Sequence, residues 1–305
     1  MATTTQTSRS SIRRRSSSFF FRHPRSRRGL TLSAPLAWML VVYLASLALL
    51  LANSFWRVDS LTSHVIRDWS WRNYDTVFSG NWRTAFLEKT YYLMTLHTVV
   101  MASLVTIADI AFAFPIAYFA ARMASPRARS AIMIAVVIPL WANYLIRVFA
   151  WKAMLEGGGP AEALLHAIGL ANASLTGTQF AMWMTFCYLW LPYAILPIFA
   201  ALERVPSSFI EASGDLGAHA GTTFRRVVFP LAVPGVAAAS IFTFSLTLGD
   251  YIVPTLVGKG VFFGNAIQEL NVSNRPLAAT VAVLPLVVVF VYLALAKRTG
   301  AFEAL

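Results

Sequence analysis

Residues 211–230 read Glu211-Ala-Ser-Gly-Asp-Leu-Gly-Ala-His-Ala-Gly-Thr-Thr-Phe-Arg-Arg-Val-Val-Phe-Pro230, and this stretch separates two apolar runs. Ser207 and Ser208 offer N-cap oxygens, and Glu211 follows Ser208 by three residues, as in a capping box. Gly217 allows a reversal of the backbone that a side chain would hinder. The stretch therefore predicts a short helix, a turn at Gly217 and a second short helix.

The second half of the stretch is expected to pack against the neighbouring apolar runs. Ala218 and Ala220 are small, and Phe224 can seat an apolar face before the next run begins. A compact helical element of this kind could be held in the groove of a partner protein. An ordinary loop between two apolar helices is the alternative, and composition alone favours it.

The apolar runs have the length of membrane-spanning helices. The chain of 305 residues is 57% hydrophobic and 12% charged, whereas soluble domains are nearer half apolar and a quarter charged. An α-helix needs about 20 apolar residues to cross a bilayer core. The sequence therefore predicts an all-α membrane protein. Its six predicted spans cover approximately residues 35–55, 92–121, 131–151, 180–202, 231–255 and 277–296.

Basic residues in the loops predict the orientation of these spans. Sixteen lysines and arginines lie on the side of the N-terminus, and eight lie on the other side. Because cytoplasmic loops carry the excess of positive charge, both termini and the 203–230 loop are predicted to be cytoplasmic. The basic, Ser/Thr-rich N-terminal tail lacks the apolar surface to fold alone, and it favours contact with membrane lipid over binding of nucleic acid.

The sequence is thus divided into four segments. Residues 1–30 are the basic cytoplasmic tail, and residues 31–91 hold the first span and a periplasmic loop. Residues 92–298 hold the other spans with the 211–230 loop, and residues 299–305 are a second cytoplasmic tail. The single cysteine, Cys187, excludes an internal disulfide.

Three ionisable residues lie inside the predicted spans, where a charge is costly and needs a partner or a cavity. They are Asp109, Arg147 and Asp250. Arg147 and Asp250 lie at similar depths, roughly 24–29 Å above the inner ends of their spans at the rise of an α-helix. They are a candidate pair, either a static ion pair or part of an outer gate. Asp109 lies deeper, and it could attract a cationic solute or form hydrogen bonds inside the bundle.

Aromatic residues near the candidate pair could add a binding surface. Trp141, Tyr144, Trp190 and Tyr193 could present cation–π faces to an ammonium group, although packing is the alternative role of aromatic residues this frequent. The candidate pathway or gate residues are Asp109, Trp141, Tyr144, Arg147 and Asp250.

The 211–230 stretch resembles the EAA loop of bacterial ABC importer permeases. The pattern of that loop is Glu-Ala-Ala, three residues, Gly, nine residues, an aliphatic residue, any residue, Leu and Pro. Ser213 replaces the third-position alanine, and Phe229 replaces the leucine. Five positions fall on the spacing: Glu211, Ala212, Gly217, Val227 and Pro230.

The resemblance covers residues 30–298 and is most detailed for spermidine/putrescine permeases. Permeases for ferric iron, thiamine, molybdate and phosphonates share much of the pattern, so a polyamine is the favoured solute and these are the alternatives. The segments that carry the resemblance are Ile138-Pro-Leu-Trp-Ala-Asn-Tyr-Leu-Ile-Arg147, Tyr188-Leu-Trp-Leu-Pro-Tyr-Ala-Ile-Leu-Pro197, Ala201-Leu-Glu-Arg-Val-Pro206, Pro230 to Gly235 and Gly249-Asp-Tyr-Ile-Val-Pro254.

The resemblance implies a type I ABC importer permease fold with six transmembrane helices in the bacterial inner membrane. It implies four kinds of partner: two ATP-binding cassette ATPase subunits, a second, homologous but different permease, an extracytoplasmic solute-binding protein, and membrane lipid, with no nucleic acid. ATP and Mg would be bound by the ATPase subunits, and no cofactor by this chain. The residues that would couple the permease to the ATPase are Glu211, Ala212, Ser213, Gly217, Ala218, Phe224, Val227 and Pro230.

Motifs for catalysis are missing from the sequence. It contains no G-x-x-x-x-G-K-[ST] phosphate loop, no H-E-x-x-H metal motif and no G-x-S-x-G elbow. We therefore expect no catalytic residue, no metal site and no enzymatic activity of the chain itself. A secondary transporter is the alternative from another class, but it would need its own ion-coupling site and often shows inverted repeats, and no such duplication is visible.

Overall fold

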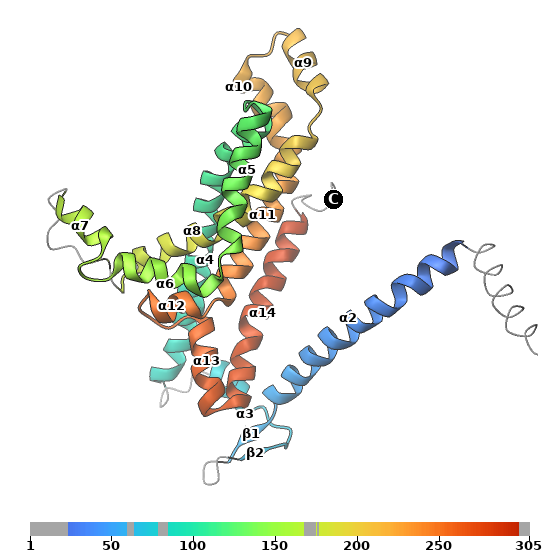
Figure 1. Cartoon of the computed structure of the whole chain (residues 1–305). Coiled ribbons are helices and arrows are strands. Elements are labelled where there is room, and N and C mark those ends of the chain that lie inside the picture. Colours follow the sequence, from blue (N-terminus) through green and yellow to red (C-terminus); the bar gives the residue numbers. More distant parts are fainter. Residues whose placement is uncertain (1–23, 60–63, 79–84, 168–174, 176, 299–305) are drawn as a thin grey trace, which may run out of the picture. The chain divides into compact units, whose positions relative to one another are not determined.

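The computed structural model describes residues 24–59, 64–78, 85–167, 175 and 177–298, and these are mostly helical (Figure 1). The chain divides into two units, residues 1–53 and residues 54–305, and each is described by itself. The first unit contributes helix α2 (Pro24–Ser54), whose last residue belongs to the second unit. Its segment Pro35–Ser54 is long and apolar enough to cross a membrane.

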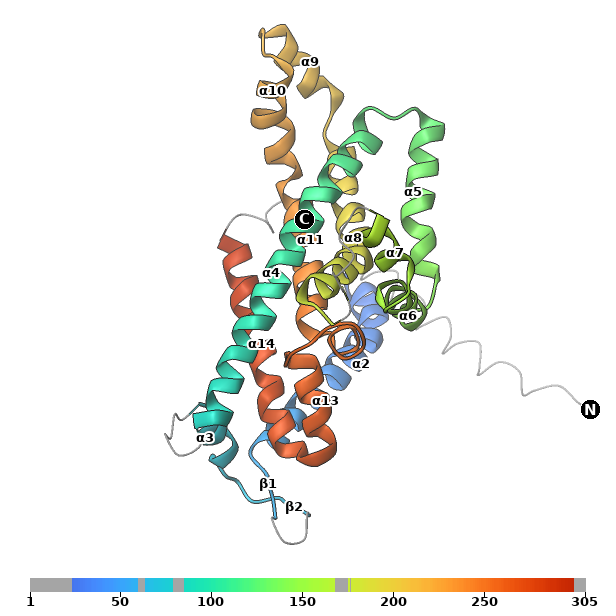
Figure 2. The same cartoon turned by 90° about the vertical axis from the view of Figure 1, so that its left-hand side faces the viewer.

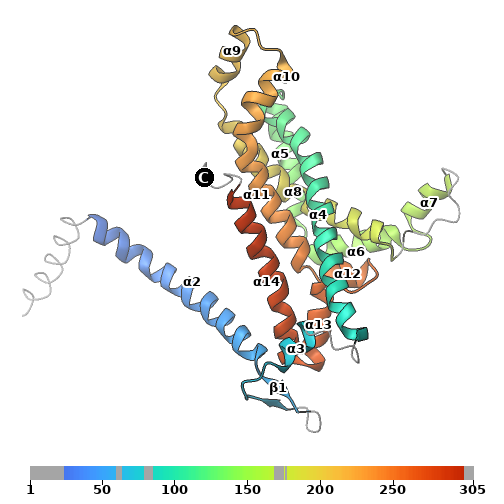
Figure 3. The same ribbon diagram turned by 180° about the vertical axis from the view of Figure 1, so that it is seen from behind.

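Three long helices form the centre of the second unit. They are α4 (Ala85–Arg122), α8 (Gln179–Arg204) and α11 (Phe229–Gly249), and they lie side by side in every view (Figures 1–3). Small residues at the contacts let the helix backbones approach closely, as is common between membrane helices. The fully buried small residues at this centre are Ala113, Ala117, Ala194, Ala232 and Ala239.

The contact between α8 and α11 is closest at Gly235. A Cβ atom at this position would lie 2.4 Å from the Cβ atom of Ala201 and 2.6 Å from the carbonyl oxygen of Pro197. Real Cβ atoms do not approach other atoms so closely, so the present spacing of the two helices requires glycine.

Further helices and a short pair of strands follow the central helices toward the end opposite residues 207–223 (Figure 1). Helix α14 (Arg275–Arg298) runs beside α11, where Phe244 stacks on Tyr292 with ring centroids 4.3 Å apart (Figure 3). Helix α13 (Phe263–Ser273) packs on α14. Helix α3 (Arg72–Phe78) lies near the antiparallel pair β1 (Arg57–Val58) and β2 (Val65–Ile66).

The third predicted span is broken, so the prediction of one helix over residues 131–151 is wrong. Helix α5 (Pro126–Trp141) ends where the backbone of Ala142 becomes extended. Helix α6 (Tyr144–Leu155) then begins, because the side-chain oxygen of Asn143 accepts a hydrogen bond of 2.9 Å from the N–H of Leu145. The two halves are bent by 94°, and α7 (Pro160–Ala167) follows α6 (Figure 2).

The count of spans agrees with the sequence. Five described helices are long and apolar enough to cross a membrane, and the bent pair α5–α6 brings the number to six when it is taken as one span. The described part of the chain therefore has the helical membrane fold that the sequence predicts, with one span interrupted.

The fifth predicted span also differs from its expected limits. Helix α10 (Ala220–Thr223), the π-helix η1 (Phe224–Val228) and α11 form one continuous element that ends at Gly249 rather than at residue 255. In η1, the N–H of Phe229 donates to the carbonyl oxygen of Phe224, five residues earlier. After Gly249 the chain turns into the short helix α12 (Ile252–Leu256).

Candidate functional site

Helices α9 (Ser207–Asp215) and α10 form a hairpin that projects beyond one end of the central helices (Figure 1). Gly217 lies at the reversal with φ +76°, a backbone conformation that residues with a side chain rarely adopt. The N–H of Ala218 donates to the carbonyl oxygen of Ser213 over 3.1 Å, which closes the end of α9. The predicted helix, glycine turn and second helix are therefore present in the structure.

The start of α9 differs from the prediction. Pro206 occupies the N-cap position, where no side chain accepts a hydrogen bond, so the capping box of Ser208 and Glu211 is not formed. The fixed φ of proline suits the start of a helix without such a cap. A different polar contact stabilises the hairpin, because the hydroxyls of Ser213 and Thr223 lie 2.9 Å apart and join α9 to the end of α10.

A groove of about 600 Å³ is lined by residues of the α9–α10 hairpin, of η1 and of the start of α11. Five of the eight predicted coupling residues contribute to its lining: Ala212, Ser213, Ala218, Val227 and Pro230. Glu211 is exposed on α9 outside this lining, and Gly217 forms the turn. The groove also contains five residues that the sequence reasoning missed: Phe209, Leu216, Thr222, Arg226 and Leu231.

Phe224 fixes the hairpin to the central helices. Its ring meets Phe114 and Tyr118 of α4 edge-on, with centroid distances of 5.7 Å and 5.6 Å. It also contacts Phe229 at the start of α11, with centroids 6.2 Å apart. The predicted role of Phe224 as an apolar seat agrees with these contacts.

Two arginines hold the end of α8 where it leads into α9. The guanidinium of Arg122, the last residue of α4, donates to the carbonyl oxygens of Leu202 and Val205. Arg129 of α5 forms an ion pair with Glu203. The base of the hairpin is thus connected to both α4 and α5.

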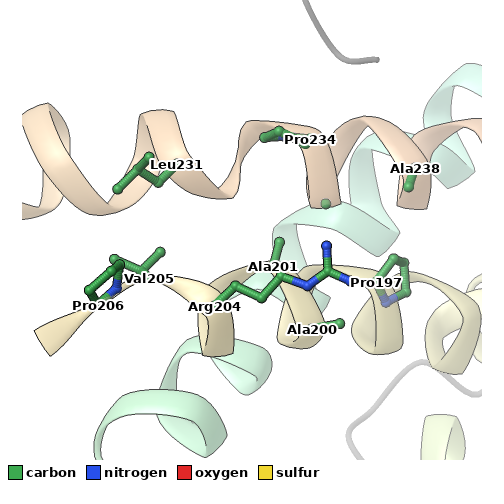
Figure 4. Close-up of a pocket in the computed structure, with 10 residues that line it drawn as sticks. Pro197, Ala200, Ala201, Arg204, Val205, Pro206, Leu231, Pro234 and Ala238 are labelled. Atoms are coloured by element: carbon green, nitrogen blue, oxygen red, sulfur yellow. The ribbon is translucent and has the colours of Figure 1, made fainter. Parts of the chain in front are cut away.

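A cavity of about 260 Å³ lies between α8 and α11 near the same end. Figure 4 shows the side chain of Arg204 running from the end of α8 back toward Pro197, in the space between the two helices. The other lining residues are Ala200, Ala201, Val205, Pro206, Leu231, Pro234, Gly235 and Ala238. Apart from Arg204 the lining is built from apolar side chains and glycine.

A second group of predicted residues gathers at the break between α5 and α6, and we call it the Tyr144 cluster: Tyr144, Arg147, Trp190, Tyr193 and Asp250. The rings of Tyr144 and Trp190 are stacked 5.8 Å apart at 9°, and Tyr193 meets Trp190 edge-on. The Tyr144 hydroxyl donates to one carboxylate oxygen of Asp250. The other carboxylate oxygen of Asp250 accepts hydrogen bonds from the N–H groups of Ile252 and Val253, over 2.8 Å and 2.9 Å.

The predicted ion pair between Arg147 and Asp250 is not formed in this structure. Tyr144 and two backbone N–H groups occupy the carboxylate of Asp250 instead. Arg147 is only 7% exposed, and its Nε and Nη1 atoms have no hydrogen-bond partner among the described residues. Its guanidinium carbon lies 6.0 Å from the centre of the Tyr144 ring.

The other two candidate pathway residues lie outside the cluster. Trp141, the last residue of α5, is 88% exposed. Asp109 of α4 is completely buried beside the thiol of Cys187, and no N–H or O–H donor among the described residues reaches its carboxylate. Three of the five predicted residues are therefore brought together, and Trp141 and Asp109 are not.

Comparisons with known proteins identify the family of the chain. The chain is 40% identical over 305 residues to the inner membrane ABC transporter permease protein YdcU of Escherichia coli (strain K12), with 95% of each chain covered. It is 29% identical to the spermidine/putrescine transport system permease protein PotB of the same strain, over 68% of this chain and 77% of PotB. A crystal structure of a bacterial ABC transporter involved in the import of the acidic polysaccharide alginate shares the fold. Its TM-score is 0.65 at 17% identity, and 89% of this chain and 96% of that chain are covered.

The sequence model of one family covers most of the membrane domain. It is described as the inner membrane component of binding-protein-dependent transport systems, and it matches residues 113–299, which include α5 to α14 and the α9–α10 hairpin. This match covers more than half of the chain. Together with the likeness to YdcU, it establishes that the chain belongs to this family, the permease subunits of ABC importers.

Proposed function

We propose that this permease imports a polyamine such as putrescine or spermidine, which an extracytoplasmic binding protein delivers. Two partner ATPase subunits bind ATP and Mg, and one of them docks on the α9–α10 hairpin. A second, homologous but different permease completes the pathway. The protein lies in the bacterial inner membrane with both termini in the cytoplasm, as the charge of its loops predicts.

The α9–α10 hairpin is the observation that carries the proposed role as the permease subunit of an ATP-driven importer. Leu216 is 88% exposed at its tip, and Phe209 is exposed on α9 beside the groove. Apolar side chains exposed around a groove on a projecting element are typical of a surface that binds another protein. Residues Glu211, Ala212, Ser213, Gly217, Ala218, Val227 and Pro230 lie on or next to this surface, and Phe224 holds it on α4.

The need for a second permease is supported by α5. None of the residues of Pro126–Trp141 is buried, although a helix of this length lies in a membrane domain. An apolar groove follows one of its faces and is lined by Met133, Ile134, Val137, Ile138 and Trp141. A second permease packed on this face would bury these side chains, which the described residues of this chain leave unburied.

The Tyr144 cluster supports a cationic solute. Stacked aromatic rings and a carboxylate are the groups that attract an ammonium ion, and here Tyr144, Trp190 and Asp250 bring them together. The similarity to PotB, a spermidine/putrescine permease protein, points to the same class of solute.

Arg147 favours a second candidate, which is an anion. The Nε and Nη1 atoms of the buried Arg147 guanidinium have no hydrogen-bond partner among the described residues, and an anionic solute that reached Arg147 would supply acceptors for them. Molybdate and phosphonates are the anions among the alternative solutes that the sequence resemblance implies. The permease assignment is the same for both candidates.

Uptake by the complete importer separates the two candidates. The importer would be purified through a tag on this chain, reconstituted in liposomes with its binding protein and supplied with ATP inside. We expect ATP-dependent uptake of labelled putrescine and spermidine, and we expect Asp250→Asn to reduce it while Asp68→Asn, in an exposed loop, does not. Uptake of molybdate or a phosphonate without polyamine uptake would replace the polyamine by the anion.

A further inference from the structure

We propose that Arg122 and Arg129 are positioning residues that transmit the movement of the α9–α10 hairpin to α4 and α5 during transport. The inference rests on the proposed docking of an ATPase on this hairpin. Arg122 of α4 and Arg129 of α5 both contact the end of α8, and we assign the mechanical link between the hairpin and the spans to these two side chains.

Arg122 connects α4 to the last turn of α8. The last carbonyl groups of a helix lack donors within the helix, and a cationic side chain satisfies them well. Arg122 donates to the carbonyl oxygen of Val205 and to that of Leu202, which also accepts the N–H of Val205 over 3.3 Å, and both residues are buried. One residue after Val205, Pro206 is the N-cap of α9. A displacement of α9 therefore acts on backbone atoms that Arg122 holds to α4, the helix that carries Asp109.

Arg129 makes the corresponding connection to α5. Its guanidinium pairs with Glu203 of α8 and lies over the ring of Phe199 with its central carbon 5.0 Å from the ring centre. Both partners lie on the last two turns of α8, so Arg129 holds the same segment as Arg122 from another side.

The position of α5 makes this contact important. Because α5 buries none of its residues, few contacts fix it to the central helices, and Arg129 supplies a polar one at the end near the α9–α10 hairpin. The other end of α5 is the bend that leads to Tyr144, which bonds Asp250. A pull on Arg129 would thus move a helix whose far end adjoins the Tyr144 cluster.

Both side chains of the Arg129–Glu203 pair are partly exposed, at 35% and 51%, so their contribution to folding is small. Loss of the pair should therefore leave the complex assembled, and its effect should be seen in coupling. The measured quantity is the number of solute molecules imported per ATP hydrolysed by the reconstituted importer, compared at equal amounts of assembled complex.

Charge reversal tests Arg129. We expect Arg129→Glu to lower the ratio of transport to ATP hydrolysis by up to about fivefold, the upper end of the range for loss of one exposed ion pair. The double variant Arg129→Glu with Glu203→Arg should restore most of the ratio. Arg127→Glu makes the same charge change on an exposed neighbour of the same helix and should leave the ratio unchanged. An unchanged ratio in Arg129→Glu, or no restoration in the double variant, would overturn the assignment of Arg129.

Substitutions of Arg122 test the second link. Arg122→Gln cannot hold both carbonyl groups with a charged donor, and we expect a larger loss of coupling than for Arg129→Glu. Arg122→Lys keeps the charge and should recover part of it. An Arg122→Gln importer that assembles and couples like the wild type contradicts the proposal. Failure of the wild-type complex to bind an ATPase would instead contradict the docking proposal, so the two failures are distinguishable.

Discussion

Replacing Gly217 by valine should uncouple the importer without unfolding it. Gly217 has φ +76°, and a Cβ atom built there would meet nothing within 4 Å. The added Cβ atom therefore meets no neighbour, and the expected effect is the cost of holding an L-residue in the left-handed region. The spans that insert into the membrane do not depend on this turn.

The cost can be estimated from the backbone alone. The left-handed conformation costs a residue with a side chain ~1–2 kcal/mol. The cost is smaller for asparagine, because its side chain can form hydrogen bonds with the nearby backbone. A cost of this size lowers the population of the turn by a factor of about 5 to 30. We expect Gly217→Asn to retain most of the coupling, Gly217→Ala to lose part of it, and Gly217→Val to lose the most.

The assay measures solute uptake and solute-stimulated ATP hydrolysis by the reconstituted importer. Gly214→Ala is the matched control, since Gly214 lies in α9 without a positive φ and a Cβ atom there also meets nothing. Alanine is preferred over glycine in a helix, so this control should couple normally. Normal uptake and normal stimulation in Gly217→Val would refute the link between the turn and coupling.

Three further predictions concern stability and orientation. Gly235→Ala should force α8 and α11 apart and lower the free energy of unfolding by ~1–3 kcal/mol, whereas Gly249→Ala enters open space; thermal unfolding of the two purified variants compares them. Asp250→Ala removes the acceptor at the start of α12 and should cost ~1 kcal/mol in the same assay, while Asp250→Asn keeps an acceptor and should cost less. A cysteine at position 215 should react with a membrane-impermeant thiol reagent only from the cytoplasm, and one at position 259 only from outside; the opposite result would reverse the proposed orientation.

The spans and the glycine turn could be predicted because their signals are local. An apolar run of sufficient length predicts a membrane helix whatever surrounds it, and the need for glycine at a positive φ depends on one residue. The bend in the third span was missed because proline is a weak signal in membrane helices. Pro115, Pro197 and Pro234 lie inside unbroken helices, whereas the break after Pro139 also depends on Asn143, which caps the next helix.

The predicted pairing of Arg147 with Asp250 was wrong because the prediction did not include the bend in the third span. Their similar depths were obtained by counting residues along straight helices. In the structure, Arg147 lies beyond the bend, and Asp250 has left its helix to cap α12. The Tyr144 hydroxyl donates to the carboxylate of Asp250 instead. This contact depends on three chain segments, and no pattern within one segment predicts it.

Part of the groove on the hairpin was within reach of the sequence. Phe209, Ala212, Ser213 and Leu216 follow the spacing of one face of a helix, so the periodicity of α9 predicts that they line the same surface. The EAA-loop pattern fixes only some positions of residues 211–230, so it could not identify the other residues of the groove. Arg226 and Leu231 could not be found in this way, because their place in the groove depends on how α10, η1 and α11 fold back against α9.

The π-helical turn has a consequence for how this region tolerates changes in chain length. A π turn accommodates one residue more than an α turn, and here the extra residue lies between Phe224 and Val228. Deleting a single residue inside η1 should convert this turn into α-helix. The orientation of α10 about the axis of α11 should then stay as it is. Deleting one residue within α11 would instead rotate everything on one side of the gap by about 100° about the helix axis. Single-residue length variation should therefore be far better tolerated within η1 than in the membrane helix that follows it.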